Sequence, residues 1–376
     1  MRILVLVTRY PRPHTKGDQQ RAFSWICDLA QRHDVCVVTS AARPAVGDAL
    51  PTGVQVVCAP GGAIGRLASA LWAGARGAPL QVGWMMPRAA WRAALREAPE
   101  ADVVLAMTCR SLRGPLPTPL VIDHVDALSL NMARRAQGDE PMPVRAFARY
   151  ESARLRAWER RCARWSAAAI VTTAQDAGAL PPRPAVEIVP VGLDAVDAAW
   201  AAAGPDRPID VVLSGNMRYP PNRRAARMLE REIAPALRAR MPDVRIVVAG
   251  RGADTLGLRG ALEVMSDVPD MLAVLRTAKI AIAPLELGTG SPYKVLEAAA
   301  CGAAVVASPW AAACFDLAAL TADDAAGYCD AICLLLSDPA RRAALVAASQ
   351  DAVRRHSTHA LARRLETLLR AAAAHE

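Results

Sequence analysis

The chain has 376 residues, of which 53% are hydrophobic, and its formal net charge is +9. An apolar content near one half excludes a largely disordered protein, and the length allows two domains with separate cores. The positive charge favours an anionic partner, such as nucleotide phosphates, an anionic membrane surface or nucleic acid.

The first apolar run, residues 3–7, is too short for the hydrophobic part of a signal peptide and far too short to span a bilayer. Longer apolar stretches elsewhere are interrupted by Arg, Asp or Pro. The nine cysteines include no Cys-x-x-Cys pair, which is typical of reduced core cysteines. We therefore expect a cytoplasmic protein that is at most peripheral to the inner face of the membrane.

Short β-branched runs alternate with helical patterns in the first half of the chain, which predicts an α/β fold with parallel sheets. The predicted strands are Ile3–Val7, Val35–Thr39, Val54–Cys58, Val103–Met107, Leu120–Ile122, Ile170–Thr173 and Glu187–Val191. A first helix is predicted near Gln20–Arg32. Its buried stripe would consist of Phe23, Ile26, Cys27 and Ala30.

A polar stretch around Pro205 and Pro208 is the predicted linker, because a second α/β series follows it. The strands of this series are expected at Val211–Ser214, Val244–Ala249, Ala261–Val264, Ile280–Ala283 and Ala304–Ala307. The tail from Thr358 to Ala374 predicts one long helix. We expect an N-terminal domain over 1–200, a C-terminal domain over 201–356 and a helix over 357–376 that can return to the N-terminal domain. Ligands should bind at the carboxyl ends of the strands.

The most informative segment, residues 284–302, reads PLELGTGSPYKVLEAAACG. Its glycines let the backbone approach a ligand, and a helix that begins near Pro292 offers free N–H groups to a diphosphate. Lys294 adds a positive charge, and Glu297 can accept hydrogen bonds from a ribose diol. A purely structural interpretation is equally open: Gly290 makes a turn, Glu297 favours the helix start and Lys294 is solvated. The candidates here are Thr289, Gly290, Ser291, Tyr293, Lys294 and Glu297.

The segment 214–224 follows the first strand of the second half. Gly215 and Asn216 stand directly at the strand end and are candidate ligand-binding residues, and Arg218 adds charge. Asn222 is predicted to cap the next helix. The neighbouring pair 223–224, two arginines, is interpreted as solvated.

The order of these motifs resembles that of family 4 retaining glycosyltransferases, in particular the subset associated with bacterial exopolysaccharide and exosortase (PEP-CTERM) systems. The motifs that carry the resemblance are GNMRYPPN at 215–222, VAGRG at 248–252, DVPDML at 267–272, APL at 283–285, GTGSPYKVLEAAACG at 288–302 and VPVGLD at 189–194. The resemblance covers nearly the whole chain and is stronger in the second half.

The resemblance implies a GT-B fold, in which two Rossmann-like domains face each other across a cleft. It implies a nucleotide diphosphate sugar held by the C-terminal domain, with contacts from Gly250, Arg251 and Val268, and an acceptor held by the N-terminal domain. No built-in metal or other cofactor is expected. The chain departs from the family where a second Glu is replaced by Thr289 and where an Arg and a Lys are replaced by Asn216 and Asn222. Lys294 and Arg218 are the predicted substitutes for the missing cations.

In the first half, the loop over residues 9–21 follows the first strand and leads into a helix. The resemblance places this loop beside the donor phosphates and the acceptor. Its candidates are the turn residues Gly17 and Asp18 and the cations Arg9, Lys16 and Arg21. The alternative is a solvated loop, and His14 is interpreted as a surface residue.

Asp123, His124 and Asp126 follow another strand. Two carboxylates and an imidazole in one loop can orient or polarise an acceptor hydroxyl, and Asp126 is the first candidate. The structural alternative is turn and cap chemistry. The catalytic candidates are thus these three residues and Lys294.

The motifs that are missing narrow the choice of function. The glycine pattern of nicotinamide enzymes is incomplete at Thr255, and no Walker A motif, Asp-x-Asp pair or His/Cys cluster occurs. We predict transfer of a sugar to an acceptor glycan, glycolipid or small molecule, with no nucleic-acid partner. Two alternatives stay open: a nucleotide-sugar epimerase of similar shape, and a non-catalytic basic protein that binds membrane or nucleic acid. Arg88, Arg92 and Arg96 share one helical face, either solvated or in peripheral contact with an anionic membrane.

Overall fold

The structure is a computed structural model that describes residues 1–12, 17–42, 49–138, 140–193, 206–260, 262–285 and 291–374. The chain forms two compact units. Unit 1 comprises residues 1–192 and 358–376, and unit 2 comprises residues 193–357. The contacts thus divide the chain at 192 and 357, whereas the sequence suggested 200 and 356. Of the expected linker around Pro205 and Pro208, Pro205 lies outside the described residues, and Pro208 directly precedes β8.

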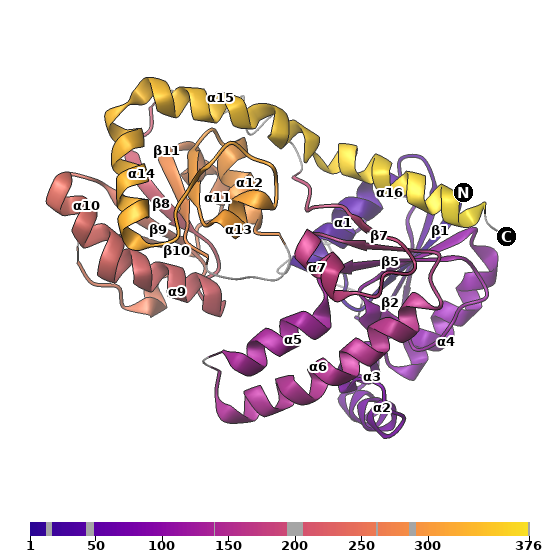
Figure 1. The fold of residues 1–376 in the computed structure, drawn as a ribbon. Coiled ribbons are helices and arrows are strands. Elements are labelled where there is room, and N and C mark those ends of the chain that lie inside the picture. The colour runs from indigo at the N-terminus through magenta and orange to yellow at the C-terminus, as the bar shows by residue number, and fades with distance from the viewer. Residues whose placement is uncertain are drawn as a thin grey trace. The chain divides into compact units, whose positions relative to one another are not determined.

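The sheet of unit 1 has seven parallel strands in the order β3-β2-β1-β4-β5-β6-β7 (Figure 1). The strands are β1 (Arg2–Val7), β2 (Asp34–Thr39), β3 (Gln55–Cys58), β4 (Val103–Met107), β5 (Leu120–Val125), β6 (Ala168–Val171) and β7 (Val186–Ile188). In β1, Val5 pairs with Val37 of β2 on one side and with Leu105 of β4 on the other. The strand order therefore reverses direction between β1 and β4, where doubly wound sheets open a crevice for a ligand.

Helices cover both faces of this sheet. They are α1 (Gly17–Leu29), α2 (Ala63–Ala75), α3 (Leu80–Met85), α4 (Arg88–Glu97), α5 (Leu128–Gln137), α6 (Met142–Ala163), α7 (Ala174–Ala179) and α16 (Thr358–Ala373). Short 3-10 turns occupy Ala98–Glu100 and Cys109–Ser111. Side chains alternate between the two faces of β1, so Ile3 and Val5 join the core under α1 and α16. Leu4 and Leu6 join the core on the other face.

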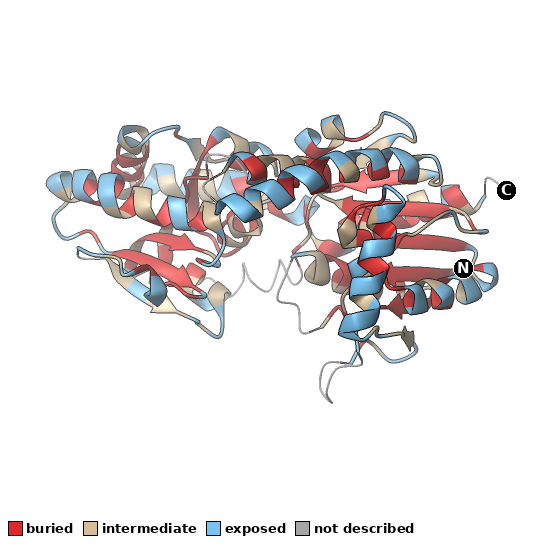
Figure 2. Ribbon diagram, turned by 90° about the horizontal axis from the view of Figure 1, so that it is seen from below, coloured by how far each residue is buried: buried red, intermediate tan, exposed pale blue. Residues whose placement is uncertain are grey.

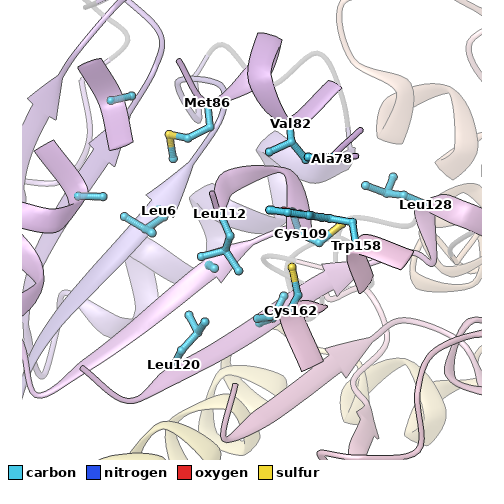
Figure 3. Packing of buried hydrophobic residues seen from close by; sticks show 14 of the residues in the cluster. Leu6, Ala78, Val82, Met86, Cys109, Leu112, Leu120, Leu128, Trp158 and Cys162 are labelled. Atoms are coloured by element: carbon cyan, nitrogen blue, oxygen red, sulfur yellow. The ribbon is translucent and has the colours of Figure 1, made fainter. Parts of the chain in front are cut away.

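The core on that other face contains large side chains from segments that are distant in sequence (Figure 3). Leu6, Met86, Leu112 and Trp158 are buried together there with a pair of thiols, Cys109 and Cys162. The nine cysteines are all free, which agrees with their expected reduced state.

The first helix of the chain faces the core differently from the predicted pattern. The prediction placed Phe23, Cys27 and Ala30 on the buried stripe, but all three are only partly buried. The helix instead buries Trp25, which is 1% exposed, together with its neighbours in the helical repeat, Ala22, Ile26 and Leu29. The apolar pattern was ambiguous because nearly every second residue of this segment is apolar, and the tryptophan decides the orientation by its larger area.

Unit 2 contains six parallel strands in the order β10-β9-β8-β11-β12-β13. They are β8 (Ile209–Ser214), β9 (Ile246–Gly250), β10 (Glu263–Ser266), β11 (Ala278–Ala283), β12 (Ala304–Ala307) and the short, unpredicted β13 (Leu320–Thr321). Five of the six strands were expected from their apolar runs. Strands β8, β9, β11 and β12 are almost entirely buried, as expected for parallel strands covered on both faces, whereas β10 at the sheet edge is only partly buried. The order is that of the dinucleotide-binding fold, and it reverses direction between β8 and β11.

The helices of unit 2 are α9 (Pro220–Met228), α10 (Ala234–Arg240), α11 (Met271–Arg276), α12 (Tyr293–Ala300), α13 (Pro309–Ala313), α14 (Ala325–Ser337) and α15 (Pro339–Arg355). A π-helical turn over Leu229–Ile233 joins α9 to α10, and a 3-10 turn spans Asp254–Leu256. In Figure 2 the central strands of both sheets are buried, the edge strands are partly exposed, and the helices alternate between buried and exposed positions. Helix α12 ends before Gly302, whose φ of 72° suits a glycine.

The last helix, α16, packs on α1 in unit 1. Its buried Glu366 accepts hydrogen bonds from Arg32 in the turn after α1, at 3.1 Å, and from Arg370, at 2.8 Å. Arg364 of the same helix donates to Glu187 of β7 at 2.9 Å. The polypeptide therefore leaves unit 1 after residue 192 and ends in unit 1. Among the described residues, no helix is both long and apolar enough to cross a membrane.

Candidate functional site

Two glycines bring the carboxyl ends of β8 and β9 into direct contact. The N–H of Gly215 donates to the carbonyl of Ala249 at 2.9 Å. A Cβ on Gly250 would lie 2.0 Å from the carbonyl oxygen of Gly215, and the φ angles of the two glycines are 144° and 133°. Neither position accommodates a side chain, so the two loops meet backbone to backbone beside the point where the strand order reverses.

Lys294 places a cation at this edge of the sheet. The residue stands in the first turn of α12, and its Nζ donates to Oδ1 of Asn222 at 2.7 Å. A Cβ on Gly215 would lie 2.8 Å from the same ammonium, so the charge sits directly against the end of β8. The Nδ2 of Asn222 donates in turn to the carbonyl of Asn216 at 2.8 Å. The side chain of Asn222 thus joins the loop after β8 to α12.

The predicted capping role of Asn222 is wrong. The residue before α9 is Tyr219, and Pro220 and Pro221 form the start of the helix. Proline suits the first turn because it has no N–H to leave unsatisfied and its φ is already helical. Asn222 therefore lies inside α9, 7% exposed, and its side chain is used for Lys294 instead of for the helix end.

Lys294 and Glu297 are both half-buried, and the charge of each affects the pKa of the other. Burial of its ammonium lowers the pKa of Lys294 to about 8, while the neighbouring carboxylate of Glu297 acts in the opposite direction. Burial raises the pKa of Glu297, and Lys294 acts against this shift. Each group is thus desolvated and partly compensated by the other. An anionic ligand at this edge would favour the charged form of Lys294.

Two arginines line the rim of the same edge. Arg218 is exposed, and its N–H donates to Oδ1 of Asn216 at 3.0 Å, which fixes the loop after β8. Arg251 is exposed after β9, with its Nε 3.9 Å from a carboxylate oxygen of Asp267. The half-buried Val268 follows β10. These positions all stand at carboxyl ends of strands, as the sequence predicted.

The loop before α12 is only partly described. Ser291 and Tyr293 are half-buried at the start of the helix. Thr289 and Gly290, which were also predicted to contact the donor, lie outside the described residues, as do Lys16 and His14 of unit 1. Among the described residues of the whole chain, no group of three His, Cys, Asp or Glu side chains is placed to hold a metal ion.

In unit 1, Arg21 and Asp123 form a buried ion pair. The Nε of Arg21 donates to Oδ2 of Asp123 at 2.6 Å, and its other nitrogens donate to the carbonyls of Pro190 and Val189 at 2.8 and 2.9 Å. The indole of Trp25 donates to the same carboxylate oxygen at 2.8 Å. Arg21 is 2% and Asp123 0% exposed. The pair ties α1 to β5 and to the end of β7, so we assign both residues a structural role in place of the predicted ligand contacts.

Arg9 and Asp18 pair with each other above the end of β1. A small hollow of about 10 Å³ lies beside them where the strand order of unit 1 reverses, lined also by Thr8, Gln19 and Thr108. Gly17 begins α1 next to this pair. The sequence pointed to this loop but did not single out Thr8, Gln19 or Thr108, because a threonine or glutamine carries no distinguishing motif.

His124 is the next-to-last residue of β5, and Asp126 follows the strand directly, because β5 extends to Val125, three residues past its predicted end at Ile122. His124 is 3% exposed, and its Nδ1 has no hydrogen-bond partner among the described residues. Burial lowers the pKa of His124 to about 4, so its imidazole is neutral at physiological pH. Asp126 is half-buried and accepts a hydrogen bond from Asn131 at 3.0 Å. Asp123, the third predicted polar residue of this segment, is paired with Arg21, so His124 and Asp126 are the two that remain candidates for binding a ligand.

Comparisons with known proteins show which family model and which solved structures the chain resembles. Residues 208–338 match the family model described as Glycosyl transferases group 1. No curated protein sequence matches the chain. Among solved structures, sucrose-phosphate synthase from Thermosynechococcus elongatus is similar with 16% identity and a TM-score of 0.71, with 98% of each chain covered.

Two further solved structures cover almost the entire chain. HepE from Anabaena, in complex with UDP-glucose, has 15% identity and a TM-score of 0.66, with 99% of this chain and 100% of that chain covered. WaaG, a glycosyltransferase involved in lipopolysaccharide biosynthesis, has 15% identity and a TM-score of 0.62, with 98% and 99% covered. At such identities the likeness shows the fold.

The fold is therefore GT-B, as predicted: two α/β units, each built on a parallel sheet. Unit 2 carries the group 1 domain. Together, the domain and the fold define the chain as an enzyme of the glycosyltransferase class.

Proposed function

We propose that the chain transfers a sugar from a nucleoside diphosphate sugar, bound at the carboxyl edge of the unit 2 sheet, to an acceptor hydroxyl. The observation that carries the proposal is the ammonium of Lys294, held against Gly215 by Asn222 where the strand order reverses. Rossmann-like sheets bind the phosphates of nucleotides at such a point. HepE, which has the same fold, was solved with UDP-glucose.

The donor diphosphate would contact Lys294 and the N–H groups at the start of α12. Glu297, one turn further along the same helix, would accept hydrogen bonds from the ribose diol. The paired glycines of the loops after β8 and β9 keep side chains away from the ligand at the strand ends. Arg218 and Arg251 lie on the exposed rim, where they can add charge to the binding of a phosphate.

In the transfer step, the bond between the anomeric carbon and the diphosphate oxygen breaks, and a bond to the acceptor oxygen forms. The acceptor proton passes to an oxygen of the departing diphosphate, which lets the reaction proceed with retention and without a strong protein base. Lys294 stabilises the charge that grows on the leaving group. Asp126 can orient the acceptor hydroxyl by accepting a hydrogen bond from it. His124, which is neutral at physiological pH, can do the same through an unprotonated ring nitrogen.

The acceptor would bind at the carboxyl edge of the unit 1 sheet. Arg9, Asp18, His124 and Asp126 stand at the ends of β1 and β5 on this edge. We propose that the acceptor is a glycan, glycolipid or small molecule, and that the enzyme is a family 4 member from an exopolysaccharide pathway, acting in the cytoplasm and in peripheral contact with the membrane. The motif order in the sequence supports this assignment.

The first experiment is calorimetric titration of the full chain with UDP, other nucleoside diphosphates and their sugars. We expect one of them to bind, and binding to weaken strongly in Lys294→Ala. A chain that binds no nucleoside diphosphate would contradict the proposal. Incubation with a bound nucleotide sugar alone then separates a transferase from an epimerase, because only an epimerase would convert the donor into a stereoisomer without an acceptor.

A further inference from the structure

Helix α2 of unit 1 exposes its large apolar side chains and buries its small ones. Ile64, Leu67 and Leu71 are spaced three and four residues apart on one face and are 86%, 53% and 60% exposed. The residues that the helix buries are Ser69, Ala70 and Ala73. A helix that packs only on its own protein shows the opposite distribution, because burial of Leu or Ile contributes far more than burial of Ala.

The tertiary contacts fix this orientation of α2. Helix α3 lies directly against its small side (Figure 1), where a Cβ on Gly83 would be 2.3 Å from the carbonyl oxygen of Ser69 and 2.6 Å from Cα of Ala70. At the far end of α2, Nη1 of Arg154 donates to the carbonyl of Gly74 at 2.9 Å. Rotation of α2 would force leucines into the space beside Gly83. The outward position of Ile64, Leu67 and Leu71, here called the α2 ridge, is therefore imposed by the packing.

Arginines gather beside Trp72 at one end of this ridge, and acids are missing from its part of the sequence. Residues 49–96 contain five arginines and no Asp or Glu. Trp72, 38% exposed beside Leu71, has the guanidinium of Arg76 4.2 Å and that of Arg88 4.6 Å from its ring centre. Arg92 and Arg96 continue from Arg88 along α4 and are exposed.

We propose that α2 lies in the interface of an anionic lipid bilayer, with the α2 ridge among the acyl chains. Arg76 and Arg88 would then meet the headgroup phosphates, and Trp72 would lie at the boundary between the two regions. An apolar stripe flanked by arginines and an aromatic residue is the composition of helices that bind in this way. This inference specifies which helix makes the proposed membrane contact. It rests on the proposed function, because the bilayer would present a lipid-linked acceptor to the enzyme.

The charges favour a bilayer over a second copy of the chain. An isologous contact through the α2 ridge would bring Arg76 and Arg88 of one copy close to the same residues of the other. Such a contact would repel, since residues 49–96 offer no carboxylate to either partner. Phosphate headgroups supply the missing negative charge.

The test is sedimentation of the full chain with vesicles made of equal parts phosphatidylcholine and phosphatidylglycerol. We expect binding that is weaker with phosphatidylcholine alone, because the arginines then lose their partners. The combined change Ile64→Ser, Leu67→Ser and Leu71→Ser should weaken binding by at least about 50-fold. Folding should persist in this variant because the three side chains are exposed, which circular dichroism and calorimetric donor binding both monitor.

A charge-matched pair of variants tests the role of the arginines. Arg76→Glu with Arg88→Glu should weaken vesicle binding by at least about 20-fold. Arg160→Glu with Arg161→Glu changes the net charge equally on an exposed part of α6 and should change binding by no more than about twofold.

Three outcomes of sedimentation would overturn the inference. They are an unaltered chain that does not sediment with anionic vesicles, a ridge variant that still binds them, and a control on α6 that loses binding as strongly as the variant beside Trp72. Analytical ultracentrifugation tests the rival occupant, a second copy of the chain. A dimer that dissociates in the ridge variant would overturn the membrane assignment. Vesicle binding is measured without any sugar donor, so a failure of the proposed transferase activity is distinguishable from a failure of membrane docking.

Discussion

The ammonium of Lys294 lies 2.7 Å from Oδ1 of Asn222, so a cation that belongs to α12 is held at the end of β8. The resemblance implies a basic residue at position 222, where this chain has an asparagine. The positive charge comes from the neighbouring helix, and an amide at position 222 holds it in place. The first two predictions below each test one consequence of this arrangement.

Lys294→Ala should weaken binding of the nucleoside diphosphate by about 10- to 100-fold, since a hydrogen bond to a charged group contributes about 1.5–3 kcal/mol. Binding of the nucleoside without phosphates should be unchanged. Calorimetry and competition titration measure the two affinities. Lys279→Ala is the matched control, because Lys279 pairs with Asp210 near the start of β11, away from the carboxyl edge. Equal losses for nucleoside and nucleoside diphosphate would show that Lys294 acts only on structure.

The affinity for the diphosphate should depend on pH. Lys294 binds an anion in its charged form, and its pKa is lowered to about 8. Affinity should therefore be steady below pH 8 and fall above it, by up to about tenfold per pH unit, as the free protein loses the proton. The Lys294→Ala variant should lack this decrease. A decrease of the same size in that variant would assign it to another group.

Glu297→Ala should weaken binding of the ribonucleoside diphosphate by about 1.5–3 kcal/mol, the contribution of a hydrogen bond to a charged acceptor. A dideoxyribose analogue should bind both forms of the protein equally, because it lacks the diol that Glu297 is proposed to hold. Titration calorimetry with the two ligands completes a thermodynamic cycle. An analogue that loses as much affinity as the natural nucleotide would reject the ribose assignment.

Gly250→Ala should destabilise unit 2 by roughly 2–4 kcal/mol, because the new Cβ would lie 2.0 Å from the carbonyl oxygen of Gly215 at a φ of 133°. Gly257→Ala is the control, since its φ is also positive, at 55°, but a Cβ there meets no atom within 4 Å. Its cost should be only about 1–2 kcal/mol. Urea unfolding measures both. If Gly257→Ala destabilised the protein as much as Gly250→Ala, the cost would come from the positive φ angle and not from the clash with the Gly215 carbonyl oxygen.

Glu366→Gln should detach α16 in part and lower stability by about 1–2 kcal/mol at neutral pH. Hydrogen bonds from Arg370 and Arg32, together with the nearby His33, lower the pKa of Glu366 to about 2, below its ordinary value of 4.5. Its stabilisation is therefore fully present above about pH 4.5 and is lost as the pH falls towards 2. Denaturant unfolding at neutral pH and at pH 3 should show a smaller difference between the two proteins at pH 3.

Glu263→Gln serves as the control for that change, because Glu263 forms an exposed pair with Arg245 on β9 and β10. Its loss should cost less than about 1 kcal/mol. An equal loss of stability in Glu263→Gln would show that the buried contacts of Glu366 stabilise α16 no more than an exposed ion pair does.

The strands and the candidate loops of unit 2 could be predicted from the sequence. β8 and β11 are continuous apolar runs because they are buried on both faces, and a Gly-containing polar loop directly after such a run stands at the ligand-binding edge of a parallel sheet. The same reasoning located Gly215, Lys294 and Glu297. These are local signals, and neighbouring residues suffice to produce them.

The contacts between distant segments could not be predicted in this way. Asn222 looked like a helix cap, and only its distance to Lys294, 72 positions further along, shows its use. Arg21 and Asp123 looked like ligand-binding groups, yet each neutralises the other in the core of unit 1. The two cases have one cause: a polar residue near a strand end gives the same sequence signal whether its partner is a ligand or another part of the protein.

The sequence by itself determined that the chain is an α/β protein with two parallel sheets, and where the strands end, because periodicity and glycine placement act over a few residues. The tertiary structure decided which charges pair inside the protein and which face outward. It also decided that α2 turns its leucines away from the core, because Gly83 of α3 leaves room only for small side chains beside it. Hydrophobic burial orients a helix only as far as close packing permits, and close packing depends on residues that the helix itself does not contain.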